Sequence, residues 1–93
     1  MEFQLPIDYT FLTSYERKIV REQYIKLQNG LCEQCKQLLK DPPVETGLYI
    51  NRSLFPPGFF NNPIHLHHNH KTGMTIGAVH AKCNAIAWQY FGE

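Results

Sequence analysis

With 93 residues, 43% hydrophobic residues and a net charge of +1, the chain has the size and composition of one small folded domain. No stretch approaches the ~20 apolar residues of a membrane-spanning helix, and residues 1–15 lack the apolar run of a signal peptide, so we expect a cytoplasmic protein. Three cysteines cannot all pair, which favours metal binding over a secreted disulfide scaffold.

Charge is divided unevenly along the chain. Residues 1–45 hold six Lys/Arg and seven Asp/Glu. Residues 46–92 hold all five histidines and no carboxylate, and their three cations are Arg52, Lys71 and Lys82. The second half can therefore lie beside a polyanion such as a nucleic acid.

The first 29 residues predict an extended arm followed by a helix. Residues 1–12 alternate apolar and polar side chains around Pro6, as an edge strand does. Residues 13–29 are expected to be helical, because Thr13 and Glu16 form a capping box and a glycine follows at position 30. The apolar face of this helix consists of Tyr15, Ile19, Val20, Tyr24 and Leu27. We expect this face in the core, and a contact with a partner chain is the alternative.

Two pairs of metal-ligand residues flank the middle of the chain. Cys32 and Cys35 form a Cys-x-x-Cys turn, and His80 and Cys83 repeat the spacing after an insertion of 44 residues. Three thiolates and one imidazole are an accepted ligand set for structural Zn²⁺. A thioredoxin-like redox pair is disfavoured, because no βαβ unit follows. The alternative for His80 is that its side chain turns into the cleft of the other histidines and does not bind the zinc.

Residues 36–63 are expected to lack regular structure over most of their length, because they contain five of the six prolines. Leu48–Ile50 is the one short strand predicted there. The three phenylalanines expected to cover the core are Phe55, Phe59 and Phe60. A loop that contacts DNA or a second subunit is the alternative for this cluster.

A histidine-rich hairpin follows. Four histidines lie within residues 65–70, a density that packing alone does not explain, and histidine is both a common metal ligand and a base near neutral pH. Ile64–His68 and Met74–Val79 predict two strands joined by a tight turn. A short apolar helix from Cys83 completes the chain. Its aromatic residues, expected in the core, are Trp88, Tyr90 and Phe91.

Together these segments resemble the HNH endonuclease superfamily, whose fold is called ββα-metal or His-Me finger. The Cys-x-x-Cys turn, the run His67-His68-Asn69-His70-Lys71-Thr72-Gly73 and the run Gly77–Asn84 occur in the order found there. The resemblance covers residues 30–92 and is greatest to the branch of recombination endonuclease seven, a phage junction-resolving enzyme. It implies a single zinc-stapled α+β domain over residues 1–93, with an N-terminal helix, in a protein of bacterial or phage type.

The resemblance also implies a metal-dependent DNA endonuclease that hydrolyses phosphodiester bonds, by nicking or by double-strand or junction cleavage. His68 takes the position of the general base, and His67 and Asn84 take those of the catalytic metal ligands. The positions of the structural zinc ligands are taken by Cys32, Cys35, His80 and Cys83. Contacts with DNA phosphates are expected from His70, Lys71, Lys82 and Arg52, and His70 is also a candidate for the catalytic group.

The catalytic ligand set departs from that branch, because His67 stands in place of an aspartate. An imidazole weakens the preference for Mg²⁺ and favours Mn²⁺, Co²⁺ or Ni²⁺. Strict alternation along a strand sends His67 and His68 to opposite faces, so both can face one cleft only if the strand twists or bulges.

Two other functions stay open: a non-catalytic zinc module that binds nucleic acid, and a protein whose histidines store or sense metal. A zinc peptidase is disfavoured, because no His-Glu-x-x-His motif occurs. We expect DNA as the partner, with no membrane and no organic cofactor. A homodimer is also expected, from the small core, the apolar helix face and the dimeric state of the resembled branch.

Overall fold

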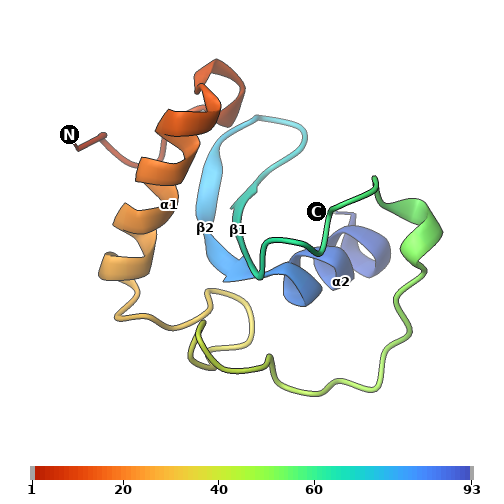
Figure 1. Cartoon of the computed structure of the whole chain (residues 1–93). Coiled ribbons are helices and arrows are strands. Elements are labelled where there is room, and N and C mark those ends of the chain that lie inside the picture. The colour runs from red at the N-terminus through yellow and green to blue at the C-terminus, as the bar shows by residue number, and fades with distance from the viewer. Residues whose placement is uncertain (1, 93) are drawn as a thin grey trace.

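The computed structural model describes residues 2–92, in which an antiparallel hairpin lies between two helices (Figure 1). The elements are α1 (Ser14–Leu27), β1 (Ile64–His68), β2 (Thr75–His80) and α2 (Ala81–Phe91), with single 3-10 turns at Tyr9–Phe11 and Arg52–Leu54. The expected α+β class is therefore confirmed. Within residues 2–92, no helix is both long enough and apolar enough to cross a bilayer.

Helix α1 begins at the predicted capping box. The Thr13 hydroxyl accepts a hydrogen bond from the Glu16 N–H at 3.1 Å, and the Glu16 carboxylate accepts one from the Thr13 N–H at 2.9 Å. These two bonds satisfy N–H groups that a helix start leaves open. The helix ends where Asn29 and Gly30 adopt positive φ angles of 55° and 76°. The prediction of a helix over residues 13–29 is confirmed.

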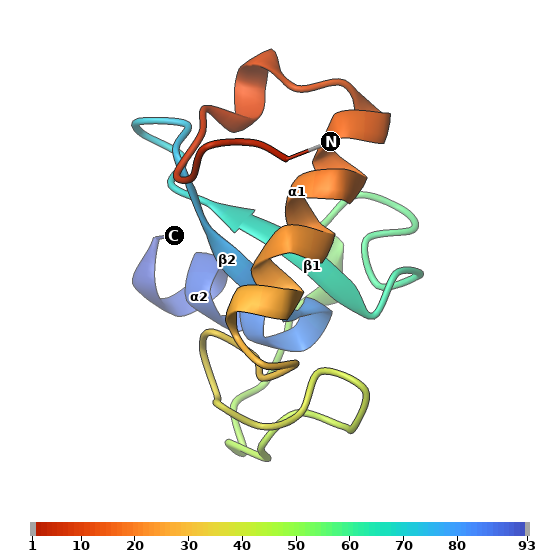
Figure 2. The same ribbon diagram turned by 90° about the vertical axis from the view of Figure 1, so that its left-hand side faces the viewer.

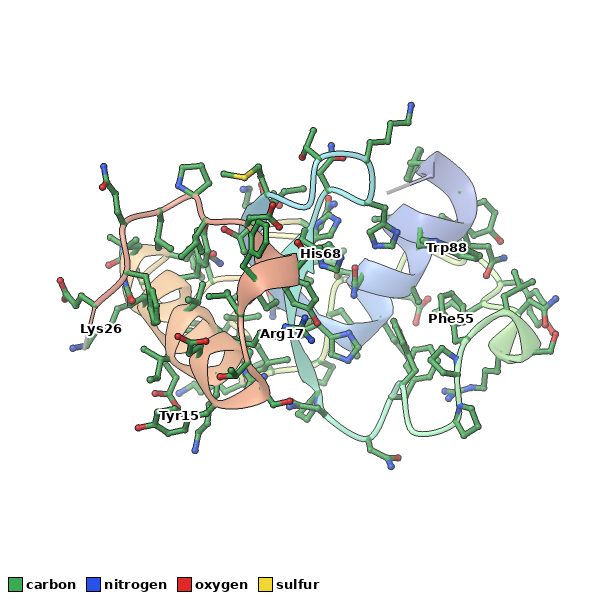
Figure 3. The ribbon with its side chains drawn as sticks, turned by 90° about the horizontal axis from the view of Figure 1, so that it is seen from above. Tyr15, Arg17, Lys26, Phe55, His68 and Trp88 are labelled. Atoms are coloured by element: carbon green, nitrogen blue, oxygen red, sulfur yellow. The ribbon has the colours of Figure 1, made fainter. Side chains whose placement is uncertain are left out.

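Only the middle of the predicted apolar face of α1 is in the core. Val20 is 0% exposed and Tyr24 is 9% exposed, whereas Tyr15 and Leu27 are 68% and 69% exposed. The expectation that the whole stripe is buried is wrong, because a sheet of two strands is too narrow to cover a helix from end to end. Figure 3 shows Tyr15 pointing away from the hairpin. The homodimer stays a prediction.

The N-terminal arm runs along the turn end of the hairpin (Figure 2). Asp8 forms a β-bridge with Met74, and Ile7 exchanges hydrogen bonds with Thr75: its N–H donates to the Thr75 hydroxyl and its carbonyl accepts from the Thr75 N–H. Within residues 2–8, pairing of the edge-strand kind is thus present at Asp8, after a bend at Leu5 and Pro6. Beyond Asp8 the chain turns at Tyr9–Phe11, which the alternating pattern did not indicate.

The hairpin contains a bulge at the histidines. His67 pairs with Gly77, but His68 pairs with Thr75, so Ile76 has no opposite residue in β1. Such a bulge increases the local twist and redirects side chains. A twist or bulge was the condition for His67 and His68 to face one cleft, and the bulge is present.

Three expectations about the second half are wrong. Leu48–Ile50 forms no strand. Phe55, Phe59 and Phe60 contact one another outside the core cluster, and this group reaches α2 through Phe55, whose ring is 5.5 Å from that of Trp88. The aromatic residues of α2 are exposed: Trp88 by 39%, Tyr90 by 43% and Phe91 by 71%. The buried side chains of α2 are those of Ala81, Ala85 and Ala87, whose small size lets the helix lie close to the hairpin. The core itself is formed by Leu12, Val20, Tyr24, Cys32, Leu39, Leu66, Ala78 and Val79.

Candidate metal centre and histidine cavity

The two predicted pairs of metal ligands converge into one cluster. The ligand atoms of Cys32, Cys35, His80 and Cys83 all lie within 4.8 Å of one another. The Nδ1 atom of His80 is 3.4 Å from the Cys35 sulfur and 3.7 Å from the Cys83 sulfur. In a tetrahedral zinc site, bonds of about 2.3 Å to sulfur and 2.0 Å to nitrogen separate the two ligands by about 3.5 Å. The cluster can therefore hold a zinc ion.

Local structure accounts for the convergence. Cys32 and Cys35 lie in the tight turn after α1, which is closed by the bond from the Lys36 N–H to the Cys32 carbonyl at 3.0 Å. His80 ends β2 and caps α2, so Cys83 lies in the first turn of that helix. The Glu33 N–H donates to the Ala78 carbonyl and ties the turn to β2. The site thus joins the end of α1 to the start of α2.

The second ring nitrogen of His80 fixes which nitrogen can bind a metal. Its Nε2 atom lies 2.8 Å from the Asp41 carbonyl oxygen and 3.0 Å from that of Leu38. Because carbonyl oxygens only accept, Nε2 carries the proton and Nδ1 presents its lone pair to the cysteines. The alternative in which His80 turns into the histidine cleft is thereby excluded.

The thiols of the cluster are not equivalent. A hydrogen bond from Cys83 lowers the pKa of Cys32 to about 4, against the opposing effect of burial. The same bond, together with burial, raises the pKa of Cys83. The His80 N–H also lies 3.5 Å from the Cys32 sulfur and stabilises a thiolate there. The Cys32 side chain is therefore available as a thiolate to bind a cation.

A separate open cavity of about 680 Å³ lies between α1, β1, α2 and the loop at residues 54–62, and is called the histidine cavity here. Its chemically active lining consists of Arg17, Arg21, His65, His68, His70 and Asn84. Among residues 2–92, no carboxylate lines this cavity. A site with cations, imidazoles and no acid favours an anionic ligand.

His68 lies in this cavity, half-buried, and its ring stacks on the ring of Tyr9 with 3.9 Å between centroids. The His70 ring is 4.8 Å away on the exposed turn. Burial lowers the pKa of His68, and the neighbouring His70, His67 and Arg17 lower it further, against a hydrogen bond with the Leu66 backbone. The imidazole is therefore neutral at pH 7.

Asn84 is paired with a histidine that the sequence did not single out. Its Nδ2 atom lies 3.1 Å from Nδ1 of His65, and His65 Nε2 lies 2.8 Å from the Phe59 carbonyl oxygen. His65 thus donates to Phe59 and accepts from Asn84. His67, the predicted co-ligand of Asn84, is 1% exposed and does not line the cavity. The catalytic ion on His67 and Asn84 stays a prediction.

Of the four predicted phosphate contacts, His70 lines the cavity and the other three do not. Lys71 is exposed on the turn beside His70, Arg52 lies over the Phe60 ring at 4.3 Å, and Lys82 lines a second cavity of about 380 Å³ between α2 and residues 42–50. Arg17 and Arg21 of α1 line the histidine cavity instead. Their i, i+4 spacing places both on one helix face and was the available signal. In Figure 3, Arg17 lies on the side of α1 that faces the hairpin and His68, and Tyr15 lies on the opposite side of the helix.

Comparison with protein-family models, with curated proteins and with solved structures found no match. The resemblance to HNH endonucleases therefore rests on the residues and their spacing.

Proposed function

We propose that the protein is a metal-dependent DNA endonuclease of the HNH type. The observation that carries this proposal is the acid-free cavity in which a neutral His68 lies within the same lining as Arg21 and Asn84. The order β1, β2, α2, with a Cys₃His cluster beside the hairpin, agrees with a ββα-metal fold. DNA is the expected partner, since the lining suits a phosphate.

His68 is the proposed general base. Hydrolysis of a phosphodiester needs a group that removes a proton from the attacking water, and an imidazole whose pKa is lowered stays unprotonated at neutral pH. The stack on Tyr9 covers one face of the ring, and one ring nitrogen bonds to the Leu66 backbone, which leaves the other nitrogen to accept a proton. Arg21 stabilises the negative charge of the phosphate from the α1 side of the cavity.

The lining offers donors for a divalent ion. Asn84 donates through Nδ2 to His65, which leaves its Oδ1 atom as an acceptor, and β1 supplies the imidazoles. Amide oxygen and imidazole suit Mn²⁺, Co²⁺ or Ni²⁺ better than Mg²⁺. The resemblance assigns the ion to Asn84 with His67, although the His67 side chain is buried outside this lining. When bound, it would neutralise charge on the phosphate and on the leaving oxygen.

The deciding experiment is cleavage of supercoiled plasmid by the purified protein with Mn²⁺ or Mg²⁺, with and without a chelator, beside His68→Ala. The expected result is metal-dependent nicking or linearisation that the variant loses. Cleavage by His68→Ala at the parent rate would reject His68 as the base. If the parent binds DNA but shows no metal-dependent cleavage, the nuclease is excluded. The non-catalytic zinc module then takes its place.

A further inference from the structure

The Tyr9 ring lies flat against the imidazole of His68. Their centroids are 3.9 Å apart and their planes differ by 7°. Tyr9 belongs to the N-terminal arm, outside the segment that resembles a nuclease, and comes 59 residues before His68. A parallel contact of this kind restricts the tilt and rotation of the imidazole.

The backbone of Tyr9 is held from two sides. Its N–H donates to the Gly73 carbonyl at 2.8 Å, which anchors it to the hairpin turn. Its carbonyl oxygen accepts from Nε and Nη2 of Arg17 at 3.3 and 3.2 Å, and the same guanidinium lies 3.8 Å from the centre of the Tyr9 ring. Tyr9 is therefore fixed to both the hairpin and α1.

Gly73 has a φ of +80°, and a Cβ atom there would lie 2.7 Å from the Asp8 carboxylate. A side chain at position 73 would push the Asp8 carboxylate aside, and the positive φ would strain any residue other than glycine. The turn that accepts the Tyr9 N–H therefore favours a glycine at this position.

His68 needs such support because of its own position. It follows the bulge, where the regular pairing of β1 and β2 shifts, and it is half-exposed to the cavity. Without the Tyr9 ring, that face of the His68 imidazole would border empty space, and the side chain could adopt more rotamers.

We propose that Tyr9 is a positioning residue, held by Arg17, that keeps the His68 imidazole in the orientation from which it takes a proton. This proposal rests on the proposed function. A displacement of about 1 Å in a catalytic group can cost about 100-fold in rate, so a stacking contact is sufficient to control the reaction.

The test compares Tyr9→Phe, which keeps the ring, with Tyr9→Leu, which removes it. Tyr15→Leu is the matched control, because Tyr15 is 68% exposed on α1. We expect Tyr9→Leu to lower kcat by about 10- to 100-fold with KM nearly unchanged, and both Tyr9→Phe and Tyr15→Leu to retain the parent values. In parallel, NMR of the His68 ring proton between its nitrogens should show an upfield ring-current shift that Tyr9→Phe keeps and Tyr9→Leu loses.

Each outcome decides a different point. An unchanged kcat in Tyr9→Leu, with the ring-current shift lost, overturns the positioning role while leaving the nuclease intact. An equal loss in Tyr9→Phe overturns it as well, since the hydroxyl and not the stack would then act. If the parent itself cleaves no DNA, the proposed function fails even though the shift persists. If Tyr9→Leu loses its zinc or its helix content, Arg17→Gln is used in its place. We expect a smaller decrease in kcat and a smaller loss of the ring-current shift in this variant. A parent-like kcat and shift would count against the proposal.

Discussion

The amide of Asn84, in the first turn of α2, lies 3.1 Å from Nδ1 of His65 in β1. This contact ties the helix that follows the zinc cluster to the strand that carries the histidines. It also places a second imidazole beside the residue that the motif assigns to the catalytic ion. Whether His65 or His67 serves that ion is open to direct experiment.

Asn84→Ala and His67→Ala should both raise the Mn²⁺ concentration required for half-maximal cleavage, and excess Mn²⁺ should restore part of the rate. His65→Ala should raise this Mn²⁺ concentration by about 10-fold. Removing a group that orients a metal ligand lowers metal affinity by about 10- to 100-fold, and we expect the lower end of that range. Metal titrations of plasmid cleavage give these values, with zinc content as the control for folding. A normal Mn²⁺ dependence in His67→Ala, beside its loss in His65→Ala, would assign the ion to His65.

The purified protein should contain one Zn²⁺ per chain. Binding at such sites contributes about 10–16 kcal/mol to folding, so Cys35→Ser should lose the metal and unfold before its chemistry can be assayed. His80→Cys is the matched variant that keeps four ligands, although it loses the hydrogen bond to the Asp41 carbonyl. Elemental analysis and circular dichroism measure both effects. A folded parent with no near-stoichiometric zinc would contradict the assignment.

His68→Ala should reduce the cleavage rate by about 10²- to 10⁴-fold, the usual contribution of a general base. Zinc content and DNA affinity should stay close to those of the parent, because His68 is half-exposed and lies outside the core cluster. Single-turnover cleavage and filter binding separate the two quantities. Parent-like cleavage by a folded His68→Ala would refute the mechanism.

Cleavage should increase with pH and level off above the pKa of His68. Burial and the neighbouring His70, His67 and Arg17 hold this pKa below the ordinary value of 6.5, and only the unprotonated ring can accept a proton. Half of the maximal rate should therefore be reached below pH 6.5. His70→Gln removes one nearby positive charge, so the midpoint should move to higher pH. A profile of kcat/KM for both proteins tests this, and a shift to lower pH would contradict it.

Arg21→Ala should weaken DNA binding and reduce its salt dependence. Loss of one phosphate contact lowers the slope of log K against log salt by about 0.9. Lys18→Ala is the control, because Lys18 is exposed on the same helix and does not line the histidine cavity. Fluorescence anisotropy with a short duplex at several salt concentrations gives the slopes. Equal slopes for Arg21→Ala and the parent would remove Arg21 from the interface.

Short-range patterns in the sequence were sufficient for several elements. The capping box of Thr13 and Glu16, the hairpin turn and the ligand spacings of the two metal pairs depend on residues only a few positions apart. Because such patterns act through local backbone geometry, they predicted α1, the hairpin and each pair of metal ligands without knowledge of the packing. That the two pairs form one Cys₃His cluster was inferred from their complementary ligand chemistry.

Only the tertiary structure decided which side chains share the histidine cavity. Tyr9, Arg21 and His65 reach it from the arm, from α1 and from β1, at separations that no local pattern encodes. The exposure of Trp88 has the same origin: α2 packs its alanines against a hairpin of two strands and leaves its larger residues outside. Which residues are buried depends on how a narrow sheet divides its limited area between two helices. The residue spacing within one element does not predict that division.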